Sequence, residues 1–363
     1  MQEIHAQKIL LPTMTDGLLW KKSGRWDSVH DELFKLKNRH EQDLILGPTY
    51  EEAITSLVAS VGIISERMLP LKLYQISTKF RDEMKSKFGL IRSKEFIMKD
   101  LYTFDSNHET AMKTYKEVMD VYSKLFQTLN IPYVCVDGHT GTIGGTLSHE
   151  YHFISEIGQD DLIICKNCGF GNNVELHDNE KCLKCDSSDI RRTKGIEVGH
   201  TFFLGDKYSK IFKATFMPKE GRAKEIQMGC YGLGVSRIMA AALEVLSVEE
   251  NRLRWPKEIV PYKVIIIAPK SGSKESVVMD QVFSLYDILN GHKAFSGDVI
   301  IDDNPGMTVG LKLRNAKKMG YPFVILFGKE SINSIIELYD YKSMIKLPID
   351  QVLAHLKSIN ISA

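Results

Sequence analysis

Residues 228–245, MGCYGLGVSRIMAAALEV, constrain the fold of this 363-residue chain more than any other stretch. Gly229, Gly232 and Gly234 remove the side chains from three of six positions, and an alanine-rich stretch containing Arg237 follows directly. Glycines inside a strand leave the backbone bare, so another backbone or a flat ligand can approach it closely. The pattern therefore predicts a strand that leads straight into a helix at about residues 235–246.

The familiar nucleotide-binding glycine loops do not match this stretch. Arg237 stands where GxGxxG would need its third glycine, and the chain contains no GxxxxGK[ST] pattern. The planar guanidinium of Arg237 would suit a phosphate tail lying on the bare strand. In the alternative interpretation the glycines only pack against a neighbouring strand, and Arg237 lies on the solvent face of the helix. This stretch alone leaves both open.

The composition is that of an ordinary globular protein, with 43% hydrophobic and 26% charged residues, and the length allows two or three domains. The formal net charge is +1, so any contact with nucleic acid must come from local patches. No apolar run approaches the roughly 18 residues that a membrane span needs, and we expect no membrane partner.

Four of the six cysteines form two CxxC pairs separated by 13 residues: Cys165, Cys168, Cys182 and Cys185. This spacing suits tetrahedral zinc, because each pair can occupy one tight turn. Nothing in the sequence indicates secretion, which disfavours disulfides. The alternative is the same kind of turn-rich segment without a metal.

The part of the chain before these cysteines predicts helices and one antiparallel hairpin. Helical patterns lie at residues 49–60, with Thr49 and Glu52 as a capping box, and at residues 107–129, where Ala111, Tyr115, Val118, Tyr122, Leu125 and Leu129 share one face. Strand patterns lie at residues 71–80 and 95–104, joined by a basic loop at 85–89. After the cysteines, further strands are expected at 200–205 and 211–216.

Beyond Pro256 and Pro261 the pattern changes. Strands at residues 263–269, 298–303 and 322–328 alternate with helices at 276–289 and 308–319, which predicts a separate α/β domain with a largely parallel sheet. In the second helix, Val309, Leu313 and Ala316 should face the core. Basic residues follow the same helix: Lys312, Arg314, Lys317 and Lys318. Such a patch is often only solvated, but as a phosphate contact it would give salt-dependent affinity.

Residues 80–96, FRDEMKSKFGLIRSKEF, add two further arginines, Arg81 and Arg92. The i, i+2 spacing of Arg81 and Glu83 would point both side chains to one face of a strand, and Arg92 would return on the partner strand with Glu95. Arginines that share a sheet surface need carboxylates or a polyanion. The alternative is a lattice of cross-strand Arg–Glu pairs on a solvated face.

These two stretches resemble signature motifs of the class II aminoacyl-tRNA synthetases. Residues 80–96 resemble motif 2, and residues 229–244 resemble motif 3 as the prolyl-tRNA synthetases have it. GPTYEE at residues 47–52, GGTLSHEY at 144–151, KGIEVGHTFFLG at 194–205 and the tract that begins DDNPG at 302 are similar as well. The likeness runs through essentially the whole chain and is specific to the bacterial and mitochondrial type.

The resemblance implies an α+β architecture with two domains. Residues 1–257 would form a catalytic domain built on an antiparallel sheet, with a small four-cysteine insert at residues 163–192. Residues 258–363 would form an α/β anticodon-binding domain.

The resemblance also implies a proline–tRNA ligase. Such an enzyme uses ATP and Mg²⁺ to convert proline into prolyl-adenylate, and then transfers the prolyl group to the 3′ end of tRNA(Pro). The attacking carboxylate is already ionised at neutral pH, so this chemistry needs neutralised charge rather than a general base. The four cysteines would hold a structural zinc ion.

Site residues carry over by position. For ATP, Arg81 would grip the α-phosphate, Glu83 the adenine or ribose end, Arg92 the far phosphates and Arg237 the γ-phosphate. Phe96 would stack on adenine, with Gly232 and Gly234 as the floor. For proline, the resemblance implies Thr49, Glu51, Arg81, Thr146, His149 and Cys230. Thr49 has a competing role as a helix cap, and His149 and Cys230 could each serve packing alone.

The chain departs from the family in two places. Only the cysteine segment stands where many bacterial relatives carry a large editing domain, so we expect this chain to have no editing activity of its own. A binding slot for proline cannot strongly exclude the smaller alanine. Residues 2–12 resemble the tail of motif 1, which predicts a fragment, a shortened isoform or a misplaced start. A homodimer is expected when the motif 1 helix is present. The insert favours the mitochondrial matrix over the cytoplasm.

Three alternatives stay open at this point. The chain could be a synthetase-like protein that binds tRNA or another partner without activating proline. It could be a sister synthetase for another amino acid. In the third alternative the CxxC pairs are the functional centre of a zinc-ribbon protein that binds nucleic acid.

Overall fold

The computed structural model describes residues 1–249 and 252–361, which form two compact units, Met1–Ala242 and Leu243–Ala363. The division falls inside helix α6 (Val235–Leu246), whereas the sequence places the domain boundary at residues 257–258 in the proline-bracketed linker; that boundary stays a prediction. Within the two described ranges, no helix combines the length and apolarity that crossing a bilayer requires.

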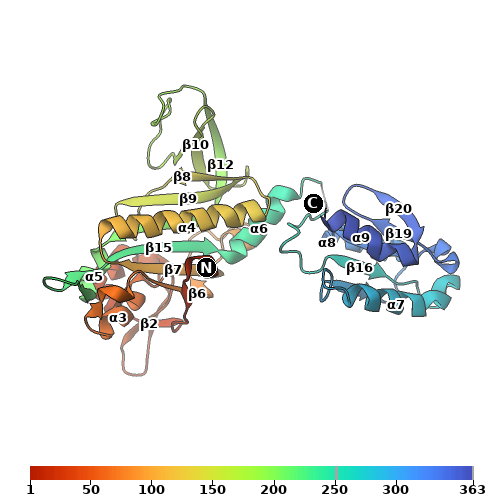
Figure 1. Cartoon of the computed structure of the whole chain (residues 1–363), viewed down its shortest axis with the longest axis horizontal. Coiled ribbons are helices and arrows are strands. Elements are labelled where there is room, and N and C mark those ends of the chain that lie inside the picture. Colours follow the sequence, from red (N-terminus) through yellow and green to blue (C-terminus); the bar gives the residue numbers. More distant parts are fainter. Residues whose placement is uncertain (250–251, 362–363) are drawn as a thin grey trace. The chain divides into compact units, whose positions relative to one another are not determined.

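A nine-stranded, mainly antiparallel sheet is the frame of the first unit (Figure 1). The strands follow the order β1-β6-β7-β15-β12-β10-β11-β8-β9, and the second half of the long strand β12 also pairs with β9. The strands are β1 (Gln7–Lys8), β6 (Leu71–Phe80), β7 (Glu95–Asp105), β8 (Tyr133–Asp137), β9 (Leu147–Ile154), β10 (Asp160–Cys165), β11 (Gly171–Asn173), β12 (Ile190–Gly205) and β15 (Gln227–Gly234).

Two three-stranded sheets and several helices complete this unit. One sheet has the order β2-β4-β3 and the other β14-β13-β5. Their strands are β2 (Met14–Asp16), β3 (Lys35–Lys37), β4 (Asp43–Leu46), β5 (Ile64–Ser65), β13 (Thr215–Met217) and β14 (Lys224–Glu225). The helices are α1 (Gly17–Ser23), α2 (Arg25–Ser28), α3 (Glu51–Ser60), α4 (His108–Thr128), α5 (Lys207–Phe212) and α6.

Helix α4 packs across one face of the large sheet, against β7, β15 and β12 (Figure 1). Its asparagine cap, Asn107, accepts from the backbone of Thr110, and the predicted face is buried except at Leu125, whose place is taken by Phe126. On the opposite face, α3 and α5 cover one end, where Tyr50 and Tyr208 belong to one apolar cluster. Part of that face therefore remains available for a cavity.

Two local predictions were wrong. Helix α3 begins at Glu51 without a side-chain cap, because the Thr49 hydroxyl donates to the Glu51 carboxylate (2.7 Å) instead of capping the helix. The strand expected at residues 211–216 is split, since α5 extends to Phe212 and β13 begins only at Thr215.

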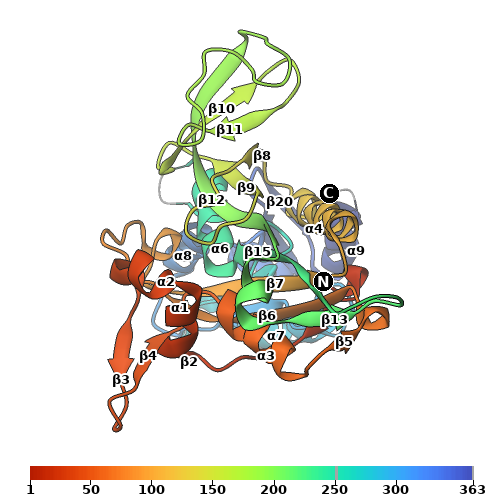
Figure 2. The ribbon, with the colours of Figure 1, turned by 90° about the vertical axis from the view of Figure 1, so that its left-hand side faces the viewer.

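The predicted hairpin of β6 and β7 is present, but its arginines are not on its strands. Arg81, Glu83 and Arg92 all lie in the connection between Phe80 and Glu95, so the argument from strand periodicity does not apply to them. The cysteine segment projects from the sheet together with β10, β11 and the first half of β12 (Figure 2).

The second unit is the expected α/β domain, with a mixed sheet of order β17-β16-β18-β19-β20. The first three strands are parallel, as predicted, and the last two form an antiparallel extension that the sequence analysis did not predict. Helices α7 and α9 pack on one face and α8 on the other, and Val309, Leu313 and Ala316 face the core as expected. The elements are β16 (Val264–Ile267), α7 (Met279–Asn290), β17 (Val299–Asp302), α8 (Val309–Met319), β18 (Phe323–Leu326), β19 (Ile335–Tyr339), β20 (Met344–Pro348) and α9 (Val352–Ile361).

Candidate active site

The glycine-rich strand β15 presents two different faces. Gly229 lies on the face covered by α4, where an added Cβ would come within 2.2 Å of the Tyr231 hydroxyl. Gly232 faces the other way, and an added Cβ would meet only Met98, at an ordinary 3.5 Å. Close packing therefore explains Gly229, whereas the bare backbone at Gly232 faces a cavity.

Two cavities meet over this part of the sheet. The first, of about 190 Å³, has Gly232 and Gly234 in its wall, and the second has a volume of about 290 Å³. Further residues line the first cavity, among them Thr49, Phe96, Met98, His200 and Phe202. Arg81, Arg237 and Glu197 line both cavities, so the two arginines singled out from distant stretches of sequence share one site.

Arg237 is held in place within the first turn of α6. Its Nε donates to the carbonyl of Ile91 (2.7 Å) and its Nη1 to the carbonyl of Glu197 (2.9 Å), while the Glu197 carboxylate lies 3.6 Å away. Burial lowers the pKa of Arg237, and the Glu197 charge opposes that shift. The guanidinium is therefore a positioned cation at the cavity wall rather than a solvent-facing side chain.

The remaining motif 2 residues divide between the cavities. The Arg81 guanidinium lies 5.4 Å from the centre of the Phe96 ring, so one face of that ring has a cation over it. Arg92 Nε donates to the Glu83 carboxylate (2.7 Å) at the wall of the second cavity. The Arg–Glu pairing that was the alternative interpretation is thus present for Glu83 and Arg92.

A buried polar network beside the cavities was missed by the sequence analysis. His200 Nδ1 lies 2.9 Å from Glu197, and its Nε2 lies 2.5 Å from the Ser148 hydroxyl. His152 Nε2 lies 2.9 Å from Glu150. These residues project from β9 and β12 to one face, a pattern visible in the alternation of polar residues in SHEYH. The network fixes the orientation of Glu197, which lines both cavities.

The predicted proline residues are only partly brought together. Thr49 lines the first cavity, and Glu51 lies directly behind it, fully buried. Glu51 accepts from Thr49 Oγ1 (2.7 Å), Cys230 Sγ (3.0 Å) and Arg25 Nη1 (3.0 Å). Burial opposes ionisation, but Arg25, Cys230 and Thr49 together hold the pKa of Glu51 below its ordinary value. Glu51 therefore supplies a negative charge behind the Thr49 hydroxyl.

His149 and Thr146 do not join this site. The His149 side chain lies on the α4 face of the sheet, where its Nδ1 is 2.8 Å from the Tyr115 hydroxyl, and burial lowers its pKa. Thr146 is exposed, and neither residue is among the described residues that line the two cavities. The structure thus contradicts the prediction that His149 closes the proline slot, because adjacent residues of a strand face opposite sides.

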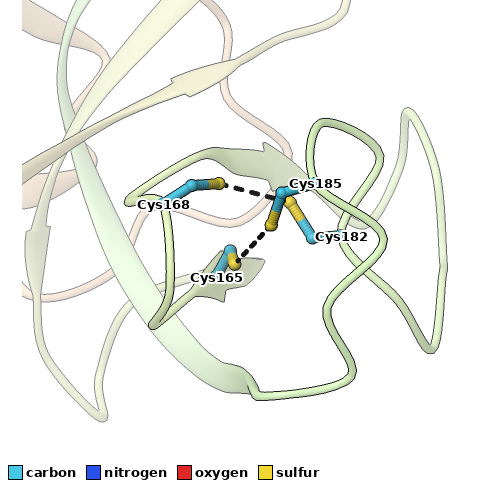
Figure 3. Close-up of side chains that lie close together, drawn as sticks. All are labelled: Cys165, Cys168, Cys182 and Cys185. Carbon is cyan, nitrogen blue, oxygen red and sulfur yellow. Dashed lines mark hydrogen bonds between the residues drawn. The ribbon is translucent and has the colours of Figure 1, made fainter.

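The four cysteines come together at the end of the projecting segment (Figure 3). All four sulfurs lie within 4.8 Å of one another, with Cys165–Cys185 at 3.6 Å and Cys168–Cys182 at 3.5 Å. A Zn–S bond of about 2.3 Å places tetrahedral sulfurs about 3.8 Å apart. The four thiols therefore fit a tetrahedral zinc ion in number, type and spacing.

The basic helix α8 differs from prediction at one position. Lys312 is fully buried, and its Nζ donates to the carbonyls of Ala268 and Asp302 (3.0 Å each) at the ends of β16 and β17. It cannot be an exposed phosphate contact. Arg314 and Lys318 are exposed, and Lys317 is half-buried with its Nζ 4.6 Å from the centre of the Tyr339 ring.

Comparisons with known proteins agree with this geometry. Residues 34–246 match the tRNA synthetase class II core domain (G, H, P, S and T), and residues 263–359 match an anticodon binding domain. A probable mitochondrial proline–tRNA ligase of Rattus norvegicus is 48% identical over 335 residues, which cover 92% of this chain and 70% of the relative. A proline–tRNA ligase of Sulfurimonas denitrificans is 35% identical over 370 residues, covering 96% of this chain and 83% of that protein.

A solved structure shares the fold. It is the Giardia lamblia prolyl-tRNA synthetase in complex with prolyl-adenylate, with a TM-score of 0.77 and 21% sequence identity. The match covers 97% of this chain and 65% of that one, so the chain spans less than two thirds of the Giardia protein.

Proposed function

The chain belongs to the class II aminoacyl-tRNA synthetases, in the family of the proline–tRNA ligases, and we propose that it uses ATP to activate proline and transfers the prolyl group to tRNA(Pro). One observation carries the proposal from the molecule's own geometry: Arg81 and Arg237 line the same two cavities, over the bare backbone of Gly232 and Gly234. A flat, polyanionic substrate fits that combination.

The activation step needs neutralised negative charge more than acid–base chemistry. An oxygen of the proline carboxylate attacks the α-phosphorus of ATP, the bond to the β-phosphate oxygen breaks, and pyrophosphate leaves with that electron pair. Arg81 and Arg237, held in the cavity walls, would neutralise the anions as they meet and stabilise the charge that develops. Mg²⁺ bound with ATP would supply further neutralisation of the phosphates.

The proline end of the site follows from the charge behind Thr49. Proline carries a secondary ammonium, which a buried carboxylate attracts strongly in a medium of low dielectric constant. We place this ammonium at Thr49, in front of Glu51, with Cys230 beside it. Phe202, which also lines the first cavity, offers apolar surface for the ring.

Proline-dependent exchange of pyrophosphate into ATP tests the proposal. The purified chain is expected to exchange with proline and far less with threonine or alanine, run side by side. Exchange with none of the three would favour a synthetase-like binding protein, and exchange with threonine alone would favour a sister enzyme.

We propose that the second unit binds tRNA(Pro) through the exposed basic residues of α8, with Lys312 serving the fold. Arg314→Ala should weaken tRNA binding and reduce its salt dependence by about one phosphate contact without changing stability, because Arg314 is exposed. Lys312→Met should instead lower the free energy of unfolding by about 2 kcal/mol, since the Ala268 carbonyl loses the buried ammonium and the Asp302 carbonyl keeps the Ala268 N–H in its place.

Filter binding of tRNA over a range of salt concentrations and thermal unfolding check these two expectations on the same proteins. Unchanged tRNA binding in Arg314→Ala would show that Arg314 does not contact the tRNA. Unchanged stability in Lys312→Met would show that its buried hydrogen bonds do not support the domain.

We propose that the four cysteines hold a structural zinc ion. The purified chain should carry about one zinc per molecule, and Cys165→Ser combined with Cys182→Ser should lose most of it, because two thiolates do not complete a structural site. Metal analysis by mass spectrometry provides the measurement. Cys135→Ser, which changes a half-buried cysteine outside the cluster, is the matched control and should retain the metal. A chain without zinc before any substitution would contradict the proposal.

We further propose that the protein acts in mitochondria and as a homodimer. The support for the compartment is the 48% identity to a mitochondrial relative. Import assays on the full coding sequence and sedimentation analysis of the purified chain would test the two statements separately.

A further inference from the structure

A buried arginine from the N-terminal region contacts the carboxylate behind Thr49. Arg25 begins α2, directly after Gly24, whose positive φ of 80° allows the sharp turn out of α1. Only 4% of Arg25 is exposed, and its guanidinium lies 4.6 Å from the centre of the Trp20 ring. Its Nη1 is 3.0 Å from Glu51 Oε2 and 3.2 Å from both carboxylate oxygens of Glu52.

The two oxygens of Glu51 have different neighbours. Oε1 accepts from Cys230 Sγ (3.0 Å), and the hydroxyl of Thr49, the residue that lines the first cavity, lies within hydrogen-bond distance of both oxygens (2.7 Å to Oε1 and 2.9 Å to Oε2). Oε2 is the oxygen that Arg25 holds. The arginine therefore fixes the carboxylate from the side away from Cys230, and leaves Oε1 beside the two residues at the proposed proline position.

The charges of this cluster do not cancel. One guanidinium faces two carboxylates whose side chains are completely buried, so the three side chains carry a net charge of −1 when both acids are ionised. Buried charge without a counter-charge is costly. A cationic group at Thr49 would balance the cluster, and the secondary ammonium of proline is such a group.

Other titratable groups also surround Glu51, and they bear on which acid keeps its charge. They are Glu52 on α3, Lys79 on β6, Tyr102 on β7, Lys207 and Tyr208 on α5, and Cys230 on β15. Burial raises the pKa of Glu52, and the neighbouring Glu51 charge raises it further, whereas the pKa of Glu51 is lowered. Arg25 opposes the shift of Glu52, and the two directions together favour the charged form of Glu51 over that of Glu52.

We propose that Arg25 is a positioning residue for the amino acid substrate: it holds Glu51 ionised and turns its Oε1 toward the site of the proline ammonium. This inference rests on the proposed function and deepens it. Arg25 touches neither cavity, and it would act only through Glu51.

The test compares Glu52→Gln with the double variant Arg25→Met, Glu52→Gln, because the double variant keeps the net charge of −1 and so avoids two unpaired carboxylates. Glu52→Gln should keep the proline KM within about twofold of the parent, since Arg25 and Glu51 stay paired. In the double variant the proline KM should rise by about tenfold or more at pH 6.5 and by less at pH 8.5, because the pKa of an unpaired buried Glu51 rises. The ATP KM should stay within about twofold, since Arg81 and Arg237 are unchanged.

An equal proline KM in the two variants across this pH range would overturn the proposal, and a purely structural arginine would change only their thermal stability. If circular dichroism shows the double variant unfolded, Arg25→Gln combined with Glu52→Gln replaces it, and a proline KM equal to that of Glu52→Gln would again overturn the proposal, because this variant also removes the charge at position 25. Calorimetric titration with proline makes the same comparison without ATP or turnover. This measurement separates the inference from the proposed function. If the parent protein binds proline but does not exchange pyrophosphate, its variants still test the role of Arg25. If the parent protein neither binds proline nor exchanges pyrophosphate, both the proposed function and this inference are overturned.

Discussion

Arg81→Ala is expected to lower kcat/KM for proline-dependent pyrophosphate exchange by about 10³-fold, because removal of one positioned charge donor from a transition state costs factors of this size. Among the described residues, Arg81 and Arg237 are the two arginines that line both cavities. Its guanidinium lies over the half-buried Phe96 ring and Arg81 is itself only half-buried, so the fold should tolerate the change. Exchange kinetics at saturating ATP and at limiting ATP would measure the loss.

Two companion variants sharpen this prediction. Arg67→Ala removes an exposed arginine of the same unit and should leave exchange unchanged. Arg81→Lys keeps the charge but not the planar fork, and should recover part of the loss. A kcat/KM for Arg81→Ala within a few fold of the parent value would show that these cavities are not where ATP reacts.

Glu51→Gln is expected to raise the proline KM by about 100-fold with little change in the ATP KM, because loss of one partner from a buried charge contact costs factors of this order. The substitution is close to isosteric, and Arg25 retains Glu52 as a partner, so the chain should fold. Steady-state exchange at varied proline concentration measures the effect.

The pH dependence gives a second check on Glu51. Since the pKa of Glu51 lies below its ordinary value, the carboxylate stays charged as pH falls toward that ordinary value. The proline KM of the parent should therefore stay flat as pH is lowered from 8 to about 5 and rise only below that. The variant has no such acid and should show no rise from this cause. A proline KM that is the same in variant and parent would remove Glu51 from the proline site.

Local patterns were sufficient for the elements that build the site. Glycines followed by alanines predicted β15 and α6, and β-branched and aromatic runs on either side of a basic loop predicted β6 and β7. That Arg81 and Arg237 share a cavity depends on four strands pairing in a particular order, and only the family resemblance implied it in advance.

The failures trace to facts that local patterns do not contain. His149 was assigned to the site and Glu150 was not, because choosing between neighbouring residues of a strand requires knowing which face carries the cavity. Arg25 was missed because its partners lie 26 and 27 residues away in the chain, with nothing between them to indicate contact.

Lys312 illustrates a different error. Its spacing from Val309 and Ala316 places it on the apolar side of α8, and this periodicity indicated burial. Its charge suggested a surface position instead. In the structure the ammonium donates to backbone carbonyls at the ends of two parallel strands. Position on the helix, rather than residue type, was the better guide.

The base of the cysteine segment has a consequence for how such chains can diverge. Cys165 and Ile190 are direct partners in the β10–β12 ladder, so the two ends of the 24 residues between them are adjacent. Strand β11, within these residues, rejoins the sheet beside β10 and β8, whereas the β10–β12 ladder closes at the base of the segment without it. Replacement of this segment by a peptide of another length or fold, with its two ends equally close, would leave the β10–β12 ladder intact. Different lineages could therefore exchange whole modules at this point without changing the active-site cavities.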